Sequence, residues 1–177
     1  MLALSTFALL AGGNFIMLTD ALRNGSTWYE DYGLGGMQYG AFQVYDEMQK
    51  YLAAHPEARI IFSPDWANGT DVVTRFFLGE PSPIAVGSVR GHLTQKLPLD
   101  DNTLFVATPQ DFDLIVNSNK FTDVRVEQII QYPNGAPGFY FVRLRYVPNI
   151  DAIFAAERAE RLILRESQVQ IDGEATQ

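Results

Sequence analysis

RIIFSPDWANGTDVVTRFFLG, residues 59–79, carries the signals that decide the fold. It opens with a short apolar run, residues 59–63, between Pro56 and Pro64, which is typical of a buried strand. Asn68 or Thr70 can then cap a helix that runs through Leu78, and Gly79 supplies its end. A short buried strand followed at once by a helix is the unit of parallel sheets, so this stretch predicts an α/β domain.

The same alternation continues downstream. IAVGS at residues 84–88 and TLFVA at residues 103–107 are two further strand candidates. Thr108, followed by Pro109 and by the acid Asp111, combines three signals of a helix start, and we expect that helix to reach about residue 119. These strands are therefore expected to be central and parallel.

The flanks of this unit are read in the same way. Upstream, residues 37–55 place apolar side chains on one helical face, and Pro56 stops the helix. Downstream, residues 124–131 and 138–146 are rich in β-formers and surround the turn-forming YPNGAP, so they predict an antiparallel hairpin.

The end of the chain predicts one more helix and one more strand. Asn149 caps a helix that extends to about residue 166. Residues 168–171 are then expected to form a strand, with a hairpin turn at residues 172–173. Because the given sequence ends before a partner strand, we expect residues 168–177 to begin a further segment.

Together these signals predict the fold class: an α/β, three-layer domain with a mainly parallel central sheet, an antiparallel edge hairpin and an N-terminal hydrophobic helix. The expected organisation is a hydrophobic helix at residues 1–24, the α/β domain at 25–167, and a truncated following segment at 168–177.

LALSTFALLAGGNFIML, residues 2–18, is largely apolar and uncharged. A membrane span needs about 20 such residues, and a signal peptide would need a basic segment in front of it. No clean polar face appears at helical spacing. We therefore expect the remainder of a transmembrane helix, followed by a polar, Gly-rich connector at residues 19–36. The alternative is a helix packed on the domain's own core.

Composition excludes several classes of site. The net charge is −8 and no basic cluster accumulates, so a nucleic-acid partner is not expected. The sequence has no cysteine, which removes disulfides, thiol nucleophiles and cysteine-based zinc sites. The two histidines, His55 and His92, lack metal-ligand spacing. No cofactor or metal is therefore expected.

Known catalytic motifs are also missing or better explained otherwise. The glycines of residues 33–40 lack a preceding strand, so they do not form a dinucleotide-binding loop. Asp111 and Asp113 have the D-x-D form that holds divalent cations in some glycosyltransferases, but acids are favoured in the first turn of any helix. No Ser/His/Asp set is recognisable, and we assign no catalytic residue.

SPDWANGT, residues 63–70, is the best candidate for a binding site. It leaves the carboxyl end of the first strand, where open α/β sheets bind ligands. Asp65 and Asn68 can bond sugar hydroxyls, Trp66 can stack on a sugar, and Thr70 begins the helix. An ordinary strand-to-helix loop with a packed Trp explains the segment equally well.

Several segments together resemble a known family. They are WY at residues 28–29, YGLGGMQYG at 32–40, SPDWANGT at 63–70, RFFL at 75–78 and YPNGAPGFYF at 132–141. Over nearly the whole chain they are similar to the extracytoplasmic C-terminal region of bacterial polytopic membrane glycosyltransferases, of the kind of the dolichyl-phosphate-mannose protein mannosyltransferases. The connector of residues 28–39 is expected near the loop, which adds Gln38 and Tyr39 as candidate ligand-binding residues.

The resemblance implies a parent enzyme that takes a sugar from a polyprenyl-phosphate donor, with its catalytic acid in an early membrane loop that this sequence lacks. The expected role is thus an accessory domain outside the cytoplasm at the cell membrane, not catalytic by itself. Its expected partners are the membrane, the transmembrane part of the parent enzyme and a glycan or polyprenyl-linked sugar. Two alternatives stay open: a stand-alone small-ligand or glycan-binding module, and a soluble metal-dependent glycosyltransferase that uses Asp111 and Asp113.

Overall fold

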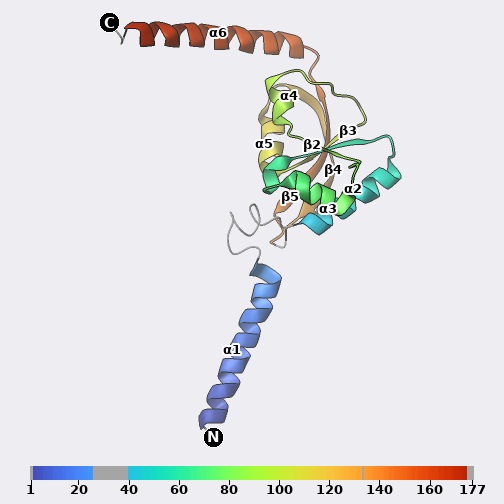
Figure 1. The fold of residues 1–177 in the computed structure, drawn as a ribbon, viewed down its shortest axis with the longest axis vertical. Coiled ribbons are helices and arrows are strands. Elements are labelled where there is room, and N and C mark those ends of the chain that lie inside the picture. The colour runs from blue at the N-terminus through green and yellow to red at the C-terminus, as the bar shows by residue number, and fades with distance from the viewer. Residues whose placement is uncertain (1, 26–39, 133, 175–177) are drawn as a thin grey trace.

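The computed structural model describes residues 2–25, 40–132 and 134–174, with side chains up to residue 164 (Figure 1). Its elements, in chain order, are α1 (Leu2–Asn24), α2 (Ala41–Ala54), β1 (Arg59–Phe62), the 3-10 turn η3 (Pro64–Trp66), α3 (Thr70–Leu78), β2 (Ala85–Val86), α4 (Arg90–Thr94), β3 (Thr103–Ala107), α5 (Pro109–Asn117), β4 (Phe121–Gln131), β5 (Pro137–Tyr146) and α6 (Ile150–Glu174).

One mixed sheet organises the domain, in the strand order β2-β1-β3-β5-β4. β1 pairs in parallel with both β2 and β3. β5 pairs antiparallel with β3 on one side and with β4 on the other. The predicted fold class is confirmed, with the three apolar runs in parallel strands and the hairpin added at one edge. The expectation that all three would be central is wrong for β2, which is the edge strand on the opposite side of the sheet.

Alternate residues of the strands face two separate cores, as the two-residue period of a strand requires. Ile60, Phe62, Leu104 and Val106 face α2 and α3. On the other face, Phe105 and Val142 pack with residues of α4 and α5. The helices therefore cover both faces of the sheet, which gives the expected three layers (Figure 1).

One end of the sheet gathers several features that matter for function. Ala107, the last residue of β3, pairs with Tyr140 near the start of β5, so the carboxyl ends of the parallel strands lie beside the β4–β5 turn. Gly40, just before α2, lies at this end too: a Cβ atom there would come within 2.9 Å of the Phe139 ring. We call this the entry end, because the chain from α1 enters the domain here (Figure 1).

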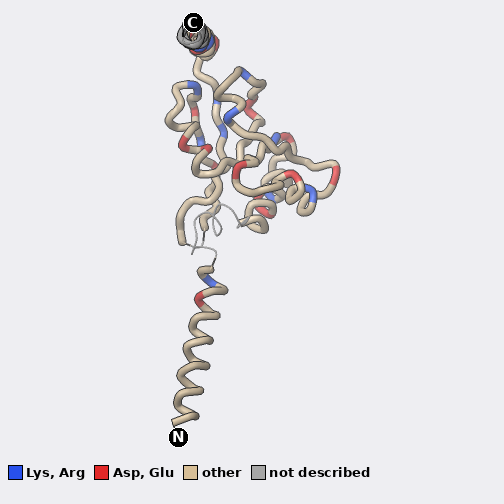
Figure 2. The backbone as a smooth tube through the Cα atoms, turned by 60° about the vertical axis from the view of Figure 1, so that its left-hand side comes forward, with Lys and Arg blue, Asp and Glu red and all other residues tan. Residues whose placement is uncertain are grey.

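α1 packs on nothing in the described part of the chain. Its 23 residues include none that is buried, and its large apolar side chains are 58–86% exposed. Its charges come only near its C-terminal end, at Asp20 and Arg23 (Figure 2). It is the one described helix long and apolar enough to cross a membrane. The structure thus rejects the alternative of a helix buried in the domain core.

Three local predictions need correction. The connector was expected from residue 19, but α1 continues to Asn24. The side-chain amide of Asn24 donates a hydrogen bond to the carboxylate of Asp20, one helical turn earlier. Neither Asn68 nor Thr70 caps α3: Gly69, at φ 72°, occupies the cap position without a side-chain hydrogen bond. The helix expected from residue 37 begins at Ala41, and residues 37–39 lie outside the described residues.

The predicted strand at residues 168–171 and the turn after it are wrong. α6 continues without a break to Glu174. Val169 and Ile171 favour strands, but they are only two residues, whereas a helix that has already formed extends at little cost per residue. The unpaired strand therefore gives no support for a following segment.

Candidate functional site

The connections of β1 and β3 diverge at the entry end. β1 leads into α3, which packs in the layer of α2, whereas its neighbour β3 leads into α5 in the opposite layer. In open α/β sheets, a divergence of this kind between adjacent parallel strands is where ligands bind. The loops after β1 and β3 therefore delimit the candidate site.

Four polar side chains meet between these loops, and we call them the switch-point cluster: Ser63, Asp65, Arg90 and Asp111. Ser63 donates its hydroxyl to Oδ2 of Asp111 at 2.5 Å. Arg90 Nε lies 3.2 Å from Oδ1 of Asp111 and 3.0 Å from Oδ2 of Asp65. The cluster thus joins the ends of β1, β2 and β3 through side chains that are far apart in the sequence.

Asp111 is the buried centre of the cluster, with no exposed surface. Its backbone N–H is capped by Thr108, and the start of α5 favours its negative charge. Oδ1 makes no hydrogen bond of normal geometry, so its charge is balanced mainly by the Arg90 ion pair. A buried carboxylate without that pair would be costly, which makes Arg90 both a partner and a cover for Asp111.

The outer part of the cluster faces solvent. The Asp65 and Arg90 side chains are 42% and 52% exposed, and with Asp111 they carry a net charge of −1. The gap beneath them, lined by Ser63 and Asp111 among apolar neighbours, does not admit a water molecule. A ligand would therefore contact Asp65 and Arg90 from outside and reach Asp111 only if Arg90 moved.

Trp66 is part of the core, and its expected stacking on a sugar is ruled out by its burial. It is only 2% exposed and packs 5.5 Å, between ring centroids, from both Phe62 and Phe139. Its indole N–H has no hydrogen-bond partner in the described structure. The large apolar surface of the Trp66 ring is more stable packed against the sheet than exposed to solvent in the loop.

The other predicted site residues separate into two groups. Thr70 is buried, and its hydroxyl donates to the carbonyls of Ala67 and Pro64, which shapes the loop. Asn68 is exposed, as is Asp65, so these two polar side chains stay accessible. Gln38 and Tyr39 lie outside the described residues.

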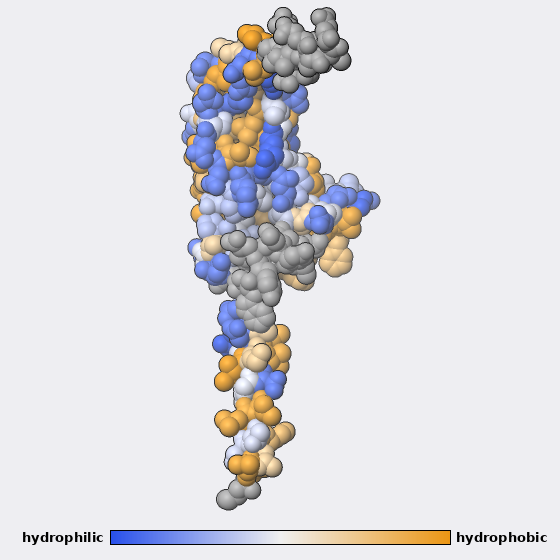
Figure 3. Space-filling view, turned by 90° about the vertical axis from the view of Figure 1, so that its left-hand side faces the viewer, coloured by the Kyte–Doolittle hydropathy of each residue, from blue (hydrophilic) through white to orange (hydrophobic). Residues whose placement is uncertain are grey.

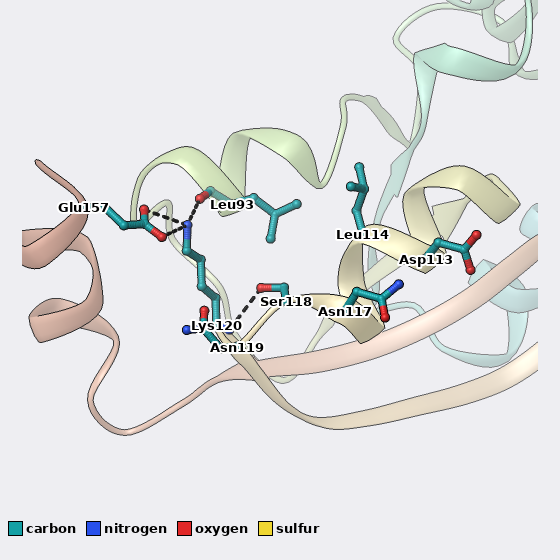
Figure 4. Close-up of a pocket in the computed structure, with 8 residues that line it drawn as sticks. All are labelled: Leu93, Asp113, Leu114, Asn117, Ser118, Asn119, Lys120 and Glu157. Carbon is teal, nitrogen blue, oxygen red and sulfur yellow. Dashed lines mark hydrogen bonds and ion pairs between the residues drawn. The ribbon is translucent and has the colours of Figure 1, made fainter. Parts of the chain in front are cut away.

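Asp111 and Asp113 do not form a shared cation site. Asp111 points into the switch-point cluster, whereas Asp113 is exposed on another side of α5 and borders a different depression (Figure 4). Two residues apart on a helix, their side chains diverge by about 200°. Within the described residues no group of three or more His, Asp or Glu could hold a metal ion.

That depression, about 540 Å³ and open to solvent, lies between α4, α5 and α6. Its one strong charge cluster is internal: the Lys120 ammonium bonds the Leu93 carbonyl and Glu157, and lies 4.8 Å from the Phe154 ring centre. Figure 4 shows Asp113 and Asn117 directed away from this lysine. Lys120 therefore ties α6 to the domain, and its charge is already paired with Glu157.

No protein-family model, curated protein or solved structure matches this chain. The geometry of the switch-point cluster is therefore the basis for assigning a role. The sequence pointed to Asp65 as a ligand-binding residue and to Asp111 as a helix-start acid or a cation ligand beside Asp113, but it did not reveal Ser63 as the partner of Asp111, nor Arg90. The available signal for Arg90 was its position just after a predicted parallel strand.

Proposed function

We propose that this chain is an accessory domain of a membrane glycosyltransferase that uses a polyprenyl-phosphate sugar donor, held on the extracytoplasmic side and not catalytic by itself. The enzyme class rests on the resemblance of the quoted segments. Physical support comes from α1, which is uncharged for most of its length and has no buried residue.

The observation that carries the proposal is the shared position of the entry end and the switch-point cluster. The chain that leaves α1 reaches the domain at the same end of the sheet as Ser63, Asp65 and Asp111. With α1 in a bilayer, we expect the exposed Asp65 and Arg90, at the tethered end of the domain, to lie toward the membrane surface. The sugar of a polyprenyl-phosphate donor, or the acceptor that receives it, is held at that surface.

The chemistry of the cluster suits binding of hydroxyl groups. Asp65 and Asn68 offer exposed acceptors, and Arg90 offers donors that a sugar can share. The net negative charge disfavours direct phosphate binding, which points to the glycan part of a substrate. Ser63 donates to a carboxylate that is itself paired with Arg90, so the hydroxyl has no strong base to activate it as a nucleophile.

The test uses the complete reading frame that encodes this sequence. Membranes that contain its product are expected to transfer sugar from a polyprenyl-phosphate donor, and the chain of residues 1–177 alone is expected to have no turnover. In the complete protein, Asp65→Asn with Asn68→Ala should raise the KM for the acceptor more than it lowers kcat. Turnover by the isolated chain, or a reading frame without further hydrophobic spans, would contradict the proposal.

A stand-alone glycan-binding module remains the second candidate, favoured by the same exposed Asp65 and Asn68. It differs in one measurable respect, because it requires no membrane. The soluble, metal-dependent transferase is not carried forward, since Asp111 and Asp113 face different sides of α5.

A further inference from the structure

α2 and α3 expose an apolar patch that the domain core does not use. Phe42 and Phe76 are 76% and 79% exposed, and Val72 is 56% exposed. Both phenylalanine rings meet the half-buried Phe77 edge-on, each with 5.1 Å between ring centroids. We call Phe42, Val72, Phe76 and Phe77 the α2–α3 patch.

Phe42, Val72 and Phe76 are exposed because they lie on the outer faces of α2 and α3, while other residues of these helices pack on the core. On α3, Thr70, Thr74 and the half-buried Phe77 face inward. Val72 and Phe76 are four residues apart and lie together on the outer face. Two almost fully exposed phenylalanines supported by a third aromatic form a contiguous apolar surface, which is uncommon on a domain that functions alone in water.

The patch begins at the entry end. Phe42 follows Gly40 by two residues, and Gly40 lies against Phe139 at the start of β5. Figure 1 shows the first turn of α2 on the end of the domain that faces α1, with α3 next to it. Figure 3 shows hydrophobic surface on the underside of the lobe that projects from the domain, the side toward α1.

We propose that the α2–α3 patch inserts into the interfacial region of the same bilayer that α1 crosses, and so orients the switch-point cluster toward the membrane surface. The inference rests on the proposed function, because it needs α1 in the membrane. Continuity with α1 favours lipid as the partner, because Phe42 lies two residues after Gly40, at the end of the domain through which α1 tethers it. Exposed aromatic and aliphatic side chains lower their free energy when they move from water to the boundary of headgroups and acyl chains.

The charges around the patch indicate which lipids it fits. Asp46, Glu47, Asp71 and Glu80 outnumber Lys50 and Arg75. Anionic headgroups attract basic residues and repel acidic ones, so the patch fits a neutral lipid surface. Insertion is therefore expected to be driven by apolar contact.

The chain has no cysteine, so single cysteines can report the position of each part. The probes are an environment-sensitive fluorophore on Phe42→Cys and Phe76→Cys, with Leu10→Cys for α1. Val116→Cys is the matched control, because Val116 is an exposed apolar residue, 50% exposed, on α5 in the opposite layer. Each labelled chain is reconstituted into phosphatidylcholine vesicles, with or without a lipid that carries a shallow nitroxide quencher.

We expect the labels at positions 42 and 76 to shift to the blue and to lose fluorescence to the lipid quencher, while the label at position 116 responds only to a water-soluble quencher. If position 10 is in lipid and positions 42 and 76 behave like 116, the inference is wrong and the proposed function survives. If position 10 is itself in water, the membrane part of the proposed function fails. Labels at 42 and 76 that are shielded from both quenchers would reveal a protein partner and would also overturn the inference.

Discussion

His92 shows at the scale of one residue how burial controls charge. It is 5% exposed, lies edge-on to Phe105 and packs beside Tyr146. Burial lowers the pKa of its imidazole, although the nearby carbonyls of Pro98 and Ser88 act in the opposite direction. Neither ring nitrogen makes a hydrogen bond of normal geometry in the described structure, so the weak carbonyl contacts do not offset desolvation.

The lowered pKa of His92 predicts acid sensitivity. Below about pH 6.5 the unfolded chain takes up a proton at this site before the folded chain does, so stability falls with decreasing pH by up to about 1.4 kcal/mol per pH unit. His92→Gln should remove that part of the slope in urea unfolding between pH 7.5 and pH 5. Equal slopes in the unmodified protein and the His92→Gln variant would contradict this explanation of His92.

Asp111 offers a second test at this scale, because its neighbour Asp113 is an internal control on the same helix. Asp111→Ala leaves the buried Ser63 hydroxyl without its acceptor and Arg90 with only Asp65, at an expected cost of about 2–4 kcal/mol in unfolding free energy. Asp113→Ala is exposed and should change stability by no more than about 0.5 kcal/mol. Urea denaturation of both variants measures the difference, and similar losses would show that Asp111 does not hold the cluster together.

The contacts of individual residues in the switch-point cluster could not be predicted from the sequence. The partners Ser63 and Asp111 are 48 positions apart, and Arg90 comes from a third loop. No local pattern records that the strand order brings these loops together. For the same reason the sequence left open whether Trp66 is displayed or packed: its packing depends on Phe139, more than 70 residues away.

At the scale of elements, the described side chains of α6, up to residue 164, contact the domain through the first turns of the helix. Ile150 and Phe154 are 3% and 2% exposed, and Lys120 bonds Glu157. Beyond that point the apolar residues Leu162, Ile163 and Leu164 are 60–66% exposed. In its described part, the helix is therefore held to the domain by contacts near its start and continues through its own backbone hydrogen bonds.

These contacts predict that two alanine substitutions on α6 will change the unfolding free energy by very different amounts. Phe154→Ala should lower the unfolding free energy by about 3 kcal/mol, because a buried ring that meets Lys120 and Tyr146 is lost. Leu162→Ala should have an effect of no more than about 0.5 kcal/mol, since an exposed side chain has little to lose. Amide hydrogen exchange should also be faster beyond residue 160 than in β3. Protection of residues 160–164 as strong as that of β3 would require a contact that the structure does not contain.

Elements with a strong local pattern were the ones predicted well. The run at residues 103–107 became β3 with those bounds, and the Thr108 signal started α5 as expected. Both depend on neighbouring residues alone. The strand expected at residues 168–171 does not form. Its few β-forming residues follow a long helix, and extension of that helix outweighs their preference for strand structure.

At the scale of the whole molecule, the domain and α1 are expected to be energetically independent. α1 contributes no buried residue, so removal of residues 1–25 should change the unfolding free energy of the domain by less than about 0.5 kcal/mol. The same deletion should abolish binding to phosphatidylcholine vesicles in flotation assays. A large loss of stability would mean that α1 packs on the domain.

One labelling measurement tests the proposal that α1 crosses the membrane and holds the domain outside the cytoplasm. Glu160 is exposed on α6. The Glu160→Cys substitution is introduced into the complete reading frame, and residues 1–177 contain no cysteine of their own. A membrane-impermeant maleimide added to intact cells is expected to label Cys at position 160 as fully as it does after lysis. Labelling only after lysis would contradict the account.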